Sequence, residues 1–304
     1  MVNESSGKSA TGKSATRALR REVDVADLPA LADFYGRMFP GRARSYWTRG
    51  FDRLASRENP DGRPRYGFAL VADGRIVGAL LTIHAASGAG PDAPIRSNLA
   101  GWAIDPAYAA QATMLSAAAL KDKSVTCTNI TATALTWPIM EAMGFKRLCG
   151  GLFVAAPFLT PRRTGTRIVT VRGLADAPAG LASGEAELLA RHAAWGCLCF
   201  AGVDGDGAAR PFVFRRLRIR RGRVPTPVAL AIHARDPRDF VDFAGALARP
   251  LALAGAPLMA LDADGPIADL RGFFTAKRGR KYAKGPAIPR RGDHADSELA
   301  IFGT

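Results

Sequence analysis

The sequence lacks any hydrophobic run long enough to cross a membrane. A membrane-spanning helix needs about 18 apolar residues in a row, and none of the apolar stretches in this sequence is close to that length. Residues 1–16 also lack the apolar central region of a secretory signal. We therefore expect a cytoplasmic protein without a membrane partner. Hydrophobic residues make up 48% of the 304 positions, which is enough for packed cores in two domains of ordinary size.

Cysteines are few, and their spacing excludes two classes of protein. No Cys-x-x-Cys pair occurs, so neither a disulfide scaffold nor a common zinc site is expected. Free core thiols in a reducing compartment are the simpler interpretation. Asp262-x-Asp264 has no further ligands at metal-loop spacing, and we predict no metal. The cysteines are Cys127, Cys149, Cys197 and Cys199.

Acidic residues are outnumbered, 27 against 42 lysines and arginines, which gives a net charge of +15. Such a charge suits a nucleic acid, an anionic lipid or a phosphorylated ligand such as coenzyme A, or it is solvated surface. No basic motif interleaved with aromatics supports nucleic acid. The basic segment at 277–291, which contains Tyr282, is broken by Gly and Pro. We predict a solvated loop laid over the domain, with a phosphate clamp as the alternative.

The N-terminus contains an isolated nucleotide-binding pattern. Residues 7–14, GKSATGKS, match the phosphate-loop motif, which needs a strand before it and a helix after it. Only six mostly polar residues precede Gly7. We therefore predict a disordered tail over residues 1–16 rather than a nucleotide site.

Residues 17–94 predict one strand, two helices and a hairpin. The strand covers 17–23, and the amphipathic helices follow at about 24–39 and 42–56. The hairpin joins 66–71 to 75–85 through Asp73-Gly74, a strong signal for a tight turn. His84, near the end of the second strand, is either a general base or a structural residue.

Residues 95–145 organise the first half of the chain. A strand at 97–104 stops at Asp105-Pro106, and an apolar helical segment follows at 108–120. A β-branched run at 125–130 and a second helix at 134–143 complete the stretch. A helix between two short strands is a βαβ crossover, which makes the two strands parallel and roughly adjacent.

This order of strand, Asp-Pro-x-Tyr, helix, strand, helix and Gly-Phe resembles the core of the GNAT superfamily of acyl-CoA-dependent N-acetyltransferases. The resemblance covers residues 17–157. It implies an α+β fold, a twisted mixed sheet flanked by helices, with acetyl-CoA or another acyl-CoA as co-substrate. The residues it places at the acyl-CoA are three of the strand before Asp-Pro, six of the next loop and one of the next strand: Trp102, Ala103, Ile104, Ala109, Ala110, Gln111, Ala112, Thr113, Met114 and Asn129.

The chain departs from the family pattern where the chemistry is concentrated. Both glycines that let backbone N–H groups approach the pyrophosphate are replaced, one by alanine and one by Met114. Met140 stands where the family often has a proton-donating tyrosine. Catalytic residues are therefore not assigned, although attack of an amine on a thioester relies heavily on proximity. We expect the substitution Met114→Gly not to reduce acyl-CoA binding.

The second half repeats the element order of the first. A last strand pair is predicted at 145–156, and a Pro-rich linker begins at 157. The next elements are strands at 167–171, 198–203, 211–219, 228–232 and 258–261 and helices at 185–194 and 237–249. In the strand at 211–219, the phenylalanines predict an apolar inner face. The arginines, which include Arg215, predict a basic outer face. We infer a divergent GNAT-like second domain over 158–304, in tandem with the first at 17–157.

Two functions stay open at this point. The first is acyl transfer, chiefly acetyl transfer, from acyl-CoA to a small amine or other small acceptor. The second is a catalytically inactive GNAT-like binding or scaffold module, favoured by the missing glycines and by Met140. Nucleic-acid binding rests on charge alone. The sequence does not predict the acceptor, the acyl chain or the oligomeric state.

Overall fold

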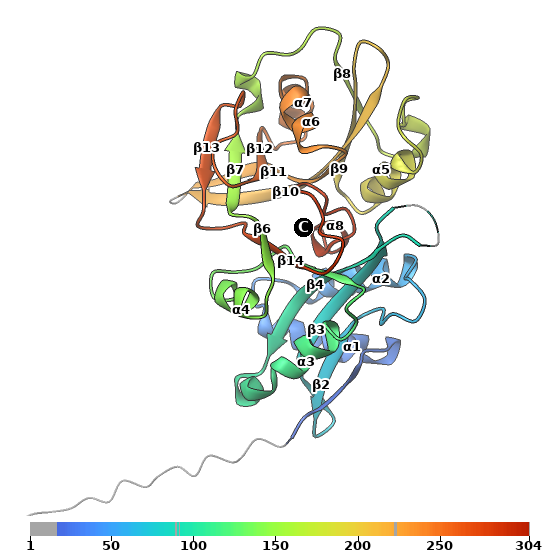
Figure 1. The fold of residues 1–304 in the computed structure, drawn as a ribbon, viewed down its shortest axis with the longest axis vertical. Helices are drawn as coiled ribbons and strands as arrows, with labels where there is room; N and C mark the ends of the chain where they lie inside the picture. The colour runs from blue at the N-terminus through green and yellow to red at the C-terminus, as the bar shows by residue number, and fades with distance from the viewer. Residues whose placement is uncertain (1–16, 89, 91, 222–223, 304) are drawn as a thin grey trace, which may run out of the picture.

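Two seven-stranded mixed sheets form the molecule (Figure 1). The structure is a computed structural model that describes residues 17–303, apart from 89, 91, 222 and 223. The predicted tail at 1–16, with its phosphate-loop pattern, lies outside the described residues. Within the described chain, no helix combines the length and apolar character needed to cross a bilayer. The α+β fold predicted from the sequence is confirmed.

The first sheet has the strand order β1-β2-β3-β4-β5-β14-β6. Helices α1 and α2 contribute to the apolar cluster on one face, and α3 and α4 to the cluster on the other. The strands are β1 (Leu19–Glu22), β2 (Phe68–Ala72), β3 (Arg75–Ala86), β4 (Ile95–Ile104), β5 (Thr126–Asn129), β14 (Lys281–Lys284) and β6 (Lys146–Cys149). The helices are η1 (Val25–Asp27), α1 (Leu28–Met38), α2 (Arg44–Ser56), η2 (Pro106–Gln111), α3 (Thr113–Ala119) and α4 (Trp137–Ala142).

The hairpin and the βαβ crossover predicted for this half are confirmed. β2 and β3 form the hairpin, with Asp73 at φ 49° and Gly74 at φ 72° in the turn. β4 and β5 are parallel neighbours, as the βαβ pattern requires. The single helix predicted at 108–120 is divided into η2 and α3. Asp105 begins η2, because its side chain accepts a hydrogen bond from the Ala107 N–H at 3.1 Å.

The second sheet has the strand order β13-β7-β12-β11-β10-β9-β8. The helix predicted at 237–249 is divided at Phe243 into α6 and α7. The strands are β13 (Gly272–Thr275), β7 (Gly151–Ala155), β12 (Leu258–Ala263), β11 (Val224–Ala234), β10 (Ala209–Arg221), β9 (Leu198–Val203) and β8 (Arg167–Thr170). The helices are η3 (Pro157–Leu159), η4 (Leu174–Asp176), α5 (Glu185–Ala194), α6 (Pro237–Asp242), α7 (Ala244–Leu253) and α8 (Glu298–Ile301).

The two halves exchange strands. β7, from the first half, pairs with β12, and β14, from the second half, lies between β5 and β6. The prediction of a strand pair within 145–156 was therefore wrong, because β6 and β7 belong to different sheets. The prediction of a solvated loop was wrong for 281–284. That segment is buried because Tyr282 packs in the core and Lys281 meets a buried carboxylate, Asp262.

The exchange predicts that neither half folds alone. The boundary at residue 157 stays a prediction, and a fragment of residues 17–157 would lack β14 between β5 and β6. It would also expose β7 as an unpaired apolar strand. We expect this fragment to aggregate or to show no cooperative unfolding transition, as measured by circular dichroism and thermal melting. A fragment that melts cooperatively as a monomer would contradict the exchange.

The C-terminal segment lies between the two sheets (Figure 1). Residues 299–302 belong to an apolar cluster shared by α1, α2 and strands of both sheets. The Phe302 ring lies 5.7 Å from that of Trp47 and 5.9 Å from that of Phe51. Arg53 donates a hydrogen bond to the Ile301 carbonyl at 2.7 Å. These contacts fix α8 at the interface.

Candidate active site

Strands β4 and β5 pair at one end and separate at the other. They are in register only from Arg96–Thr126 to Asn98–Thr128. Beyond this point β4 carries an irregularity, with Gly101 at φ 56°. A Cβ at this position would lie 3.1 Å from the Tyr35 hydroxyl, so both the space and the backbone angle favour glycine. The separation opens one edge of β4 toward the second sheet.

A cavity of about 530 Å³ occupies this opening. Its wall includes Trp102 from β4, Asn129 from β5, and the loop 130–133 that follows β5. The α1–α2 connection contributes Arg42 and α2 contributes Tyr46, while β10 contributes Arg215. The first turn of α8 closes the remaining side. We call this space the splay cavity; its size suits a small ligand or part of a larger one.

Glu298 is the ionisable group of the splay cavity best suited to proton transfer. Its side chain is half-buried and accepts a hydrogen bond from the Thr131 hydroxyl at 2.5 Å. The Glu298 backbone N–H donates to the Asn98 side chain at 2.8 Å. Burial raises the pKa of Glu298 to about 7, although Thr131 and Arg215 oppose the rise. A carboxyl group with this pKa can take up a proton near neutral pH.

A second cavity of about 1220 Å³ is lined by Ser297, the residue before Glu298. It is also lined by five arginines, of which Arg57, Arg96, Arg191 and Arg235 contact carboxylates of the described residues. Arg96 contacts Asp293 at 2.6 Å, and Arg57 contacts Asp296 at 3.3 Å. Because these ions are already paired, this cavity offers fewer free charges to a ligand than its volume suggests.

The ten residues predicted to contact the acyl-CoA lie in three parts of the structure. Trp102 and Asn129 line the splay cavity. Ala103 and Ile104 continue β4 and pair with β3. The loop residues lie in η2 and at the start of α3: Ala109, Ala110, Gln111, Ala112, Thr113 and Met114. That all ten residues contact an acyl-CoA stays a prediction.

Two of the loop side chains already have protein contacts. Gln111 accepts a hydrogen bond from the Ala18 N–H at 3.0 Å, which ties the loop to the segment before β1. Met114 packs against the apolar cluster on the α3 face of the first sheet. The bulk of Met114 is thus directed into the protein core.

Two further side chains that the sequence singled out do not line the splay cavity. Met140 is fully buried, and its sulfur accepts a hydrogen bond from Asn129 at 3.6 Å. His84 is buried and lines neither cavity. Burial, with Arg63 and Arg57 nearby, lowers the pKa of His84 to about 4. The structural interpretation of His84 is therefore the better one.

The second sheet repeats the opening, but its own chain fills it. β11 and β12 are parallel and in register only from Val228–Leu258 to Leu230–Ala260. Beyond this point, the His294 N–H donates to the Ile232 carbonyl at 2.9 Å. The Ala234 N–H donates to the Gly292 carbonyl at 3.2 Å. The segment 292–294 thus takes the backbone groups of β11 that the opening would otherwise expose.

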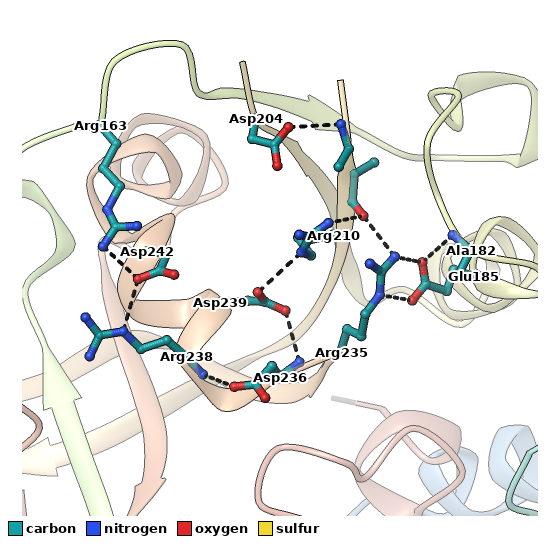
Figure 2. Close-up of polar contacts among 12 residues, drawn as sticks. Arg163, Ala182, Glu185, Asp204, Arg210, Arg235, Asp236, Arg238, Asp239 and Asp242 are labelled. Carbon is teal, nitrogen blue, oxygen red and sulfur yellow. Dashed lines mark hydrogen bonds and ion pairs between the residues drawn. The ribbon is translucent and has the colours of Figure 1, made fainter. Parts of the chain in front are cut away.

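The helix after this second opening begins with acidic residues (Figure 2). Asp236-Pro237 starts α6 at the place where Asp105-Pro106 starts η2 in the first half. Asp236 accepts from the Arg238 N–H at 2.7 Å, and Asp239 accepts from the Asp236 N–H at 2.9 Å. These carboxylates already bind the free N–H groups and would repel a phosphate. At the first opening a single carboxylate, Asp105, caps the helix start, so the first opening is the less acidic of the two.

Two sheets, each with a parallel pair that opens before an Asp-Pro helix start, define a tandem GNAT-type fold. Solved structures agree over most of the chain. A GCN5-related N-acetyltransferase from Anabaena variabilis superposes with a TM-score of 0.55 at 11% identity, covering 88% of this chain and 72% of that chain. A putative acetyltransferase from Pyrococcus horikoshii has a TM-score of 0.52 at 10% identity, covering 99% and 100%.

A third solved structure gives the same result. It is a protein of unknown function from Enterococcus faecalis, described as a probable N-acyltransferase, with a TM-score of 0.53 at 10% identity and coverage of 88% and 72%. No protein-family model matches the sequence, and no curated protein matches it. At these identities the likeness establishes the fold, and the function rests on the site.

Sequence reasoning missed Glu298 and Arg215. Glu298 is nearly 170 residues from Thr131 in the chain, and no local motif marks it. Arg215 was predicted on the outer, basic face of its strand, and this was wrong. Its side chain is 5% exposed, because its strand faces the first sheet on that side. The splay cavity thus combines segments whose sequences carry no common pattern.

Proposed function

We propose that the protein is an acyl-CoA-dependent N-acyltransferase that moves an acetyl group from acetyl-CoA to a small amine. The observation that carries the proposal is the Glu298 carboxyl group, with its pKa near 7, in the cavity where β4 and β5 separate. The GNAT-type fold supports an acyl-CoA at this opening. The cavity volume supports an acceptor of small size.

In the proposed reaction, Glu298 takes a proton from the ammonium group of the acceptor. The free amine then attacks the thioester carbonyl and the new C–N bond forms. The C–S bond breaks as the CoA thiolate leaves, and the thiolate takes the second proton of the amine nitrogen to become the CoA thiol. Thr131 and the Asn98 contact hold Glu298 in place for the first step. Proximity of the two bound substrates supplies much of the remaining rate, so a protein proton donor in place of Met140 is not required.

Acetyl-CoA should stabilise the protein in thermal melting. At about one hundred times its dissociation constant, a ligand of the folded state alone adds about 2.7 kcal/mol. The substitution Ala132→Trp, which fills the splay cavity, should remove this shift. The same substitution at Ala86, in the wall of the second cavity, is the matched control and should leave the shift unchanged.

The outcomes separate the two candidate functions. A shift that Ala132→Trp removes and Ala86→Trp preserves supports an acyl-CoA site at the first opening. If no acyl-CoA of any chain length shifts the melting temperature, the inactive binding module becomes the better proposal. The missing glycines at Ala112 and Met114 would then explain the loss, because they normally admit the pyrophosphate.

A further inference from the structure

Arg215 is a buried arginine whose hydrogen-bonding neighbours among the described residues are a carbonyl and a hydroxyl group. Its side chain extends from β10 into the wall of the splay cavity. Its Nη1 atom donates to the Leu299 carbonyl at 3.4 Å, and the Tyr46 hydroxyl lies beside it. Its Nε atom is buried without a hydrogen-bond partner in the part of the chain that the structure describes. No carboxylate of the described residues lies within ion-pair distance of it.

This arrangement is unusual for a guanidinium group. Buried charges are ordinarily paired, because removing an isolated ion from water costs several kcal/mol. Two other arginines with low exposure, Arg96 and Arg57, follow the rule, since both contact carboxylates. Glu298 shares the cavity with Arg215, yet its side chain bonds to Thr131 instead. Burial, with Arg42 nearby, lowers the pKa of Arg215, as expected for a charge without a counterion.

Other cations surround the same cavity. Arg42 and Arg278 line its wall, and Arg42 lies 4.6 Å from the centre of the Tyr46 ring. Lys281 also reaches the wall, but its charge is matched by Asp262 at 2.6 Å. Glu298 is the only carboxylate among the described lining residues, and its raised pKa keeps part of the population neutral. Cationic side chains therefore outnumber carboxylates in the described wall of the cavity.

We propose that Arg215 binds an anionic group of the substrate, a carboxylate or phosphate, in the splay cavity while the acceptor amine lies toward Glu298. A planar guanidinium matches such groups with two parallel hydrogen bonds. The anion has two possible sources, which are an acidic amine such as an amino acid and the free carboxylate of a dicarboxylic acyl-CoA. Assigning the anion to a substrate rests on the proposed function, whereas the anion site itself does not.

Binding of matched probes tests the site without requiring turnover. Isothermal titration in a chloride buffer would compare alanine with ethylamine, and O-phosphoethanolamine with ethanolamine. Succinyl-CoA and acetyl-CoA form the third pair. In each pair the first ligand carries an anionic group that the second lacks. In at least one pair, we expect the ligand with the anionic group to bind at least tenfold more tightly than its partner. Arg215→Met should remove this preference, and Arg215→Lys should keep part of it.

Arg216→Met is the matched control. Arg216 is the next residue of β10, is exposed, and donates to the Ala254 carbonyl at 2.9 Å, so its loss should change none of the preferences. Arg215→Met should still melt cooperatively, because an apolar side chain suits a buried site.

The binding preferences show whether Arg215 binds an anion and which substrate carries it. A preference for acidic amines that Arg215→Met removes places the anion on the acceptor. A preference for succinyl-CoA that the variant removes places it on the acyl group. No preference in any pair, or one that persists in Arg215→Met, overturns the proposal. If acidic amines bind through Arg215 but no acyl-CoA binds, the anion site stands and the proposed acyltransferase function fails.

Discussion

Glu298→Gln should lower kcat/KM for acetyl transfer by about 10²–10⁴, the usual contribution of a general base. Glutamine keeps the size of the side chain and its capacity to bond with Thr131, but it cannot take a proton from the acceptor ammonium. The measurement is the initial rate of CoA thiol release with the best acceptor found by screening. Activity equal to that of the wild type would remove Glu298 from the mechanism.

The pH profile gives a second, independent readout of Glu298. Only the carboxylate can accept the proton, so the wild-type rate should rise as pH increases through about 7, the pKa to which burial raises this group. The Glu298→Gln variant should lack this limb of the profile. A wild-type rate that is flat between pH 6 and 8, with chemistry rate-limiting, would contradict the assignment.

Stability measurements separate loss of catalysis from loss of fold. Because the pKa of Glu298 is raised above its ordinary value, folding favours the neutral form, and stability falls as pH rises through about 7. Glu298→Gln should therefore melt no lower than the wild type at pH 8. Glu141→Gln is a suitable control. Glu141 accepts from the Tyr282 hydroxyl at 3.0 Å outside the splay cavity, so its loss should leave the pH profile unchanged.

Local signals predicted much of the fold. Asp73-Gly74 specified a tight hairpin turn, because both residues tolerate positive φ. Asp105-Pro106 marked the end of β4, because the aspartate side chain caps the next turn and proline cannot extend the strand ladder. These interactions join residues within a few positions, so one stretch of sequence contains all the information that they need.

The strand exchange and the site could not be predicted in this way. Lys281 lies in a segment dense with lysine and arginine, which is typical of a solvated loop. It is buried only because Asp262, on β12, supplies the opposite charge. Likewise, Glu298 and Arg215 acquire their properties from burial between two sheets. Such environments depend on the tertiary fold, which pattern and composition do not specify.

Lys281→Met should lower the free energy of unfolding by about 3–5 kcal/mol, because it leaves a buried carboxylate without its main counterion. Lys281 is 2% exposed, and its Nζ atom lies 2.6 Å from Asp262 Oδ1. The other oxygen of Asp262 contacts His294 Nε2 at 2.6 Å. The three residues tie β14 and the segment at 292–294 to β12. Denaturant titration at pH 7 measures the loss.

The pH dependence of this cluster has a defined sign. Although burial alone would raise it, the pKa of Asp262 is held well below its ordinary value of 3.8 by Lys281 and His294. The stabilisation is therefore present above about pH 4 and is lost as pH falls toward the native-state pKa. In Lys281→Met the carboxylate lacks most of this support, so its pKa should rise and acid unfolding should begin at higher pH.

A second ion pair two residues away provides the matched control. Asp264 pairs with Arg291, but both side chains are about half exposed, at 55% and 44%. Exposed pairs contribute about 0–1 kcal/mol, because water already solvates both charges. Arg291→Met should therefore cost far less than Lys281→Met, although both remove the cation of an Asp pair. An equal loss of unfolding free energy in the two variants would contradict this account. It would show that Lys281 stabilises the protein through packing of its alkyl chain and not through its charge.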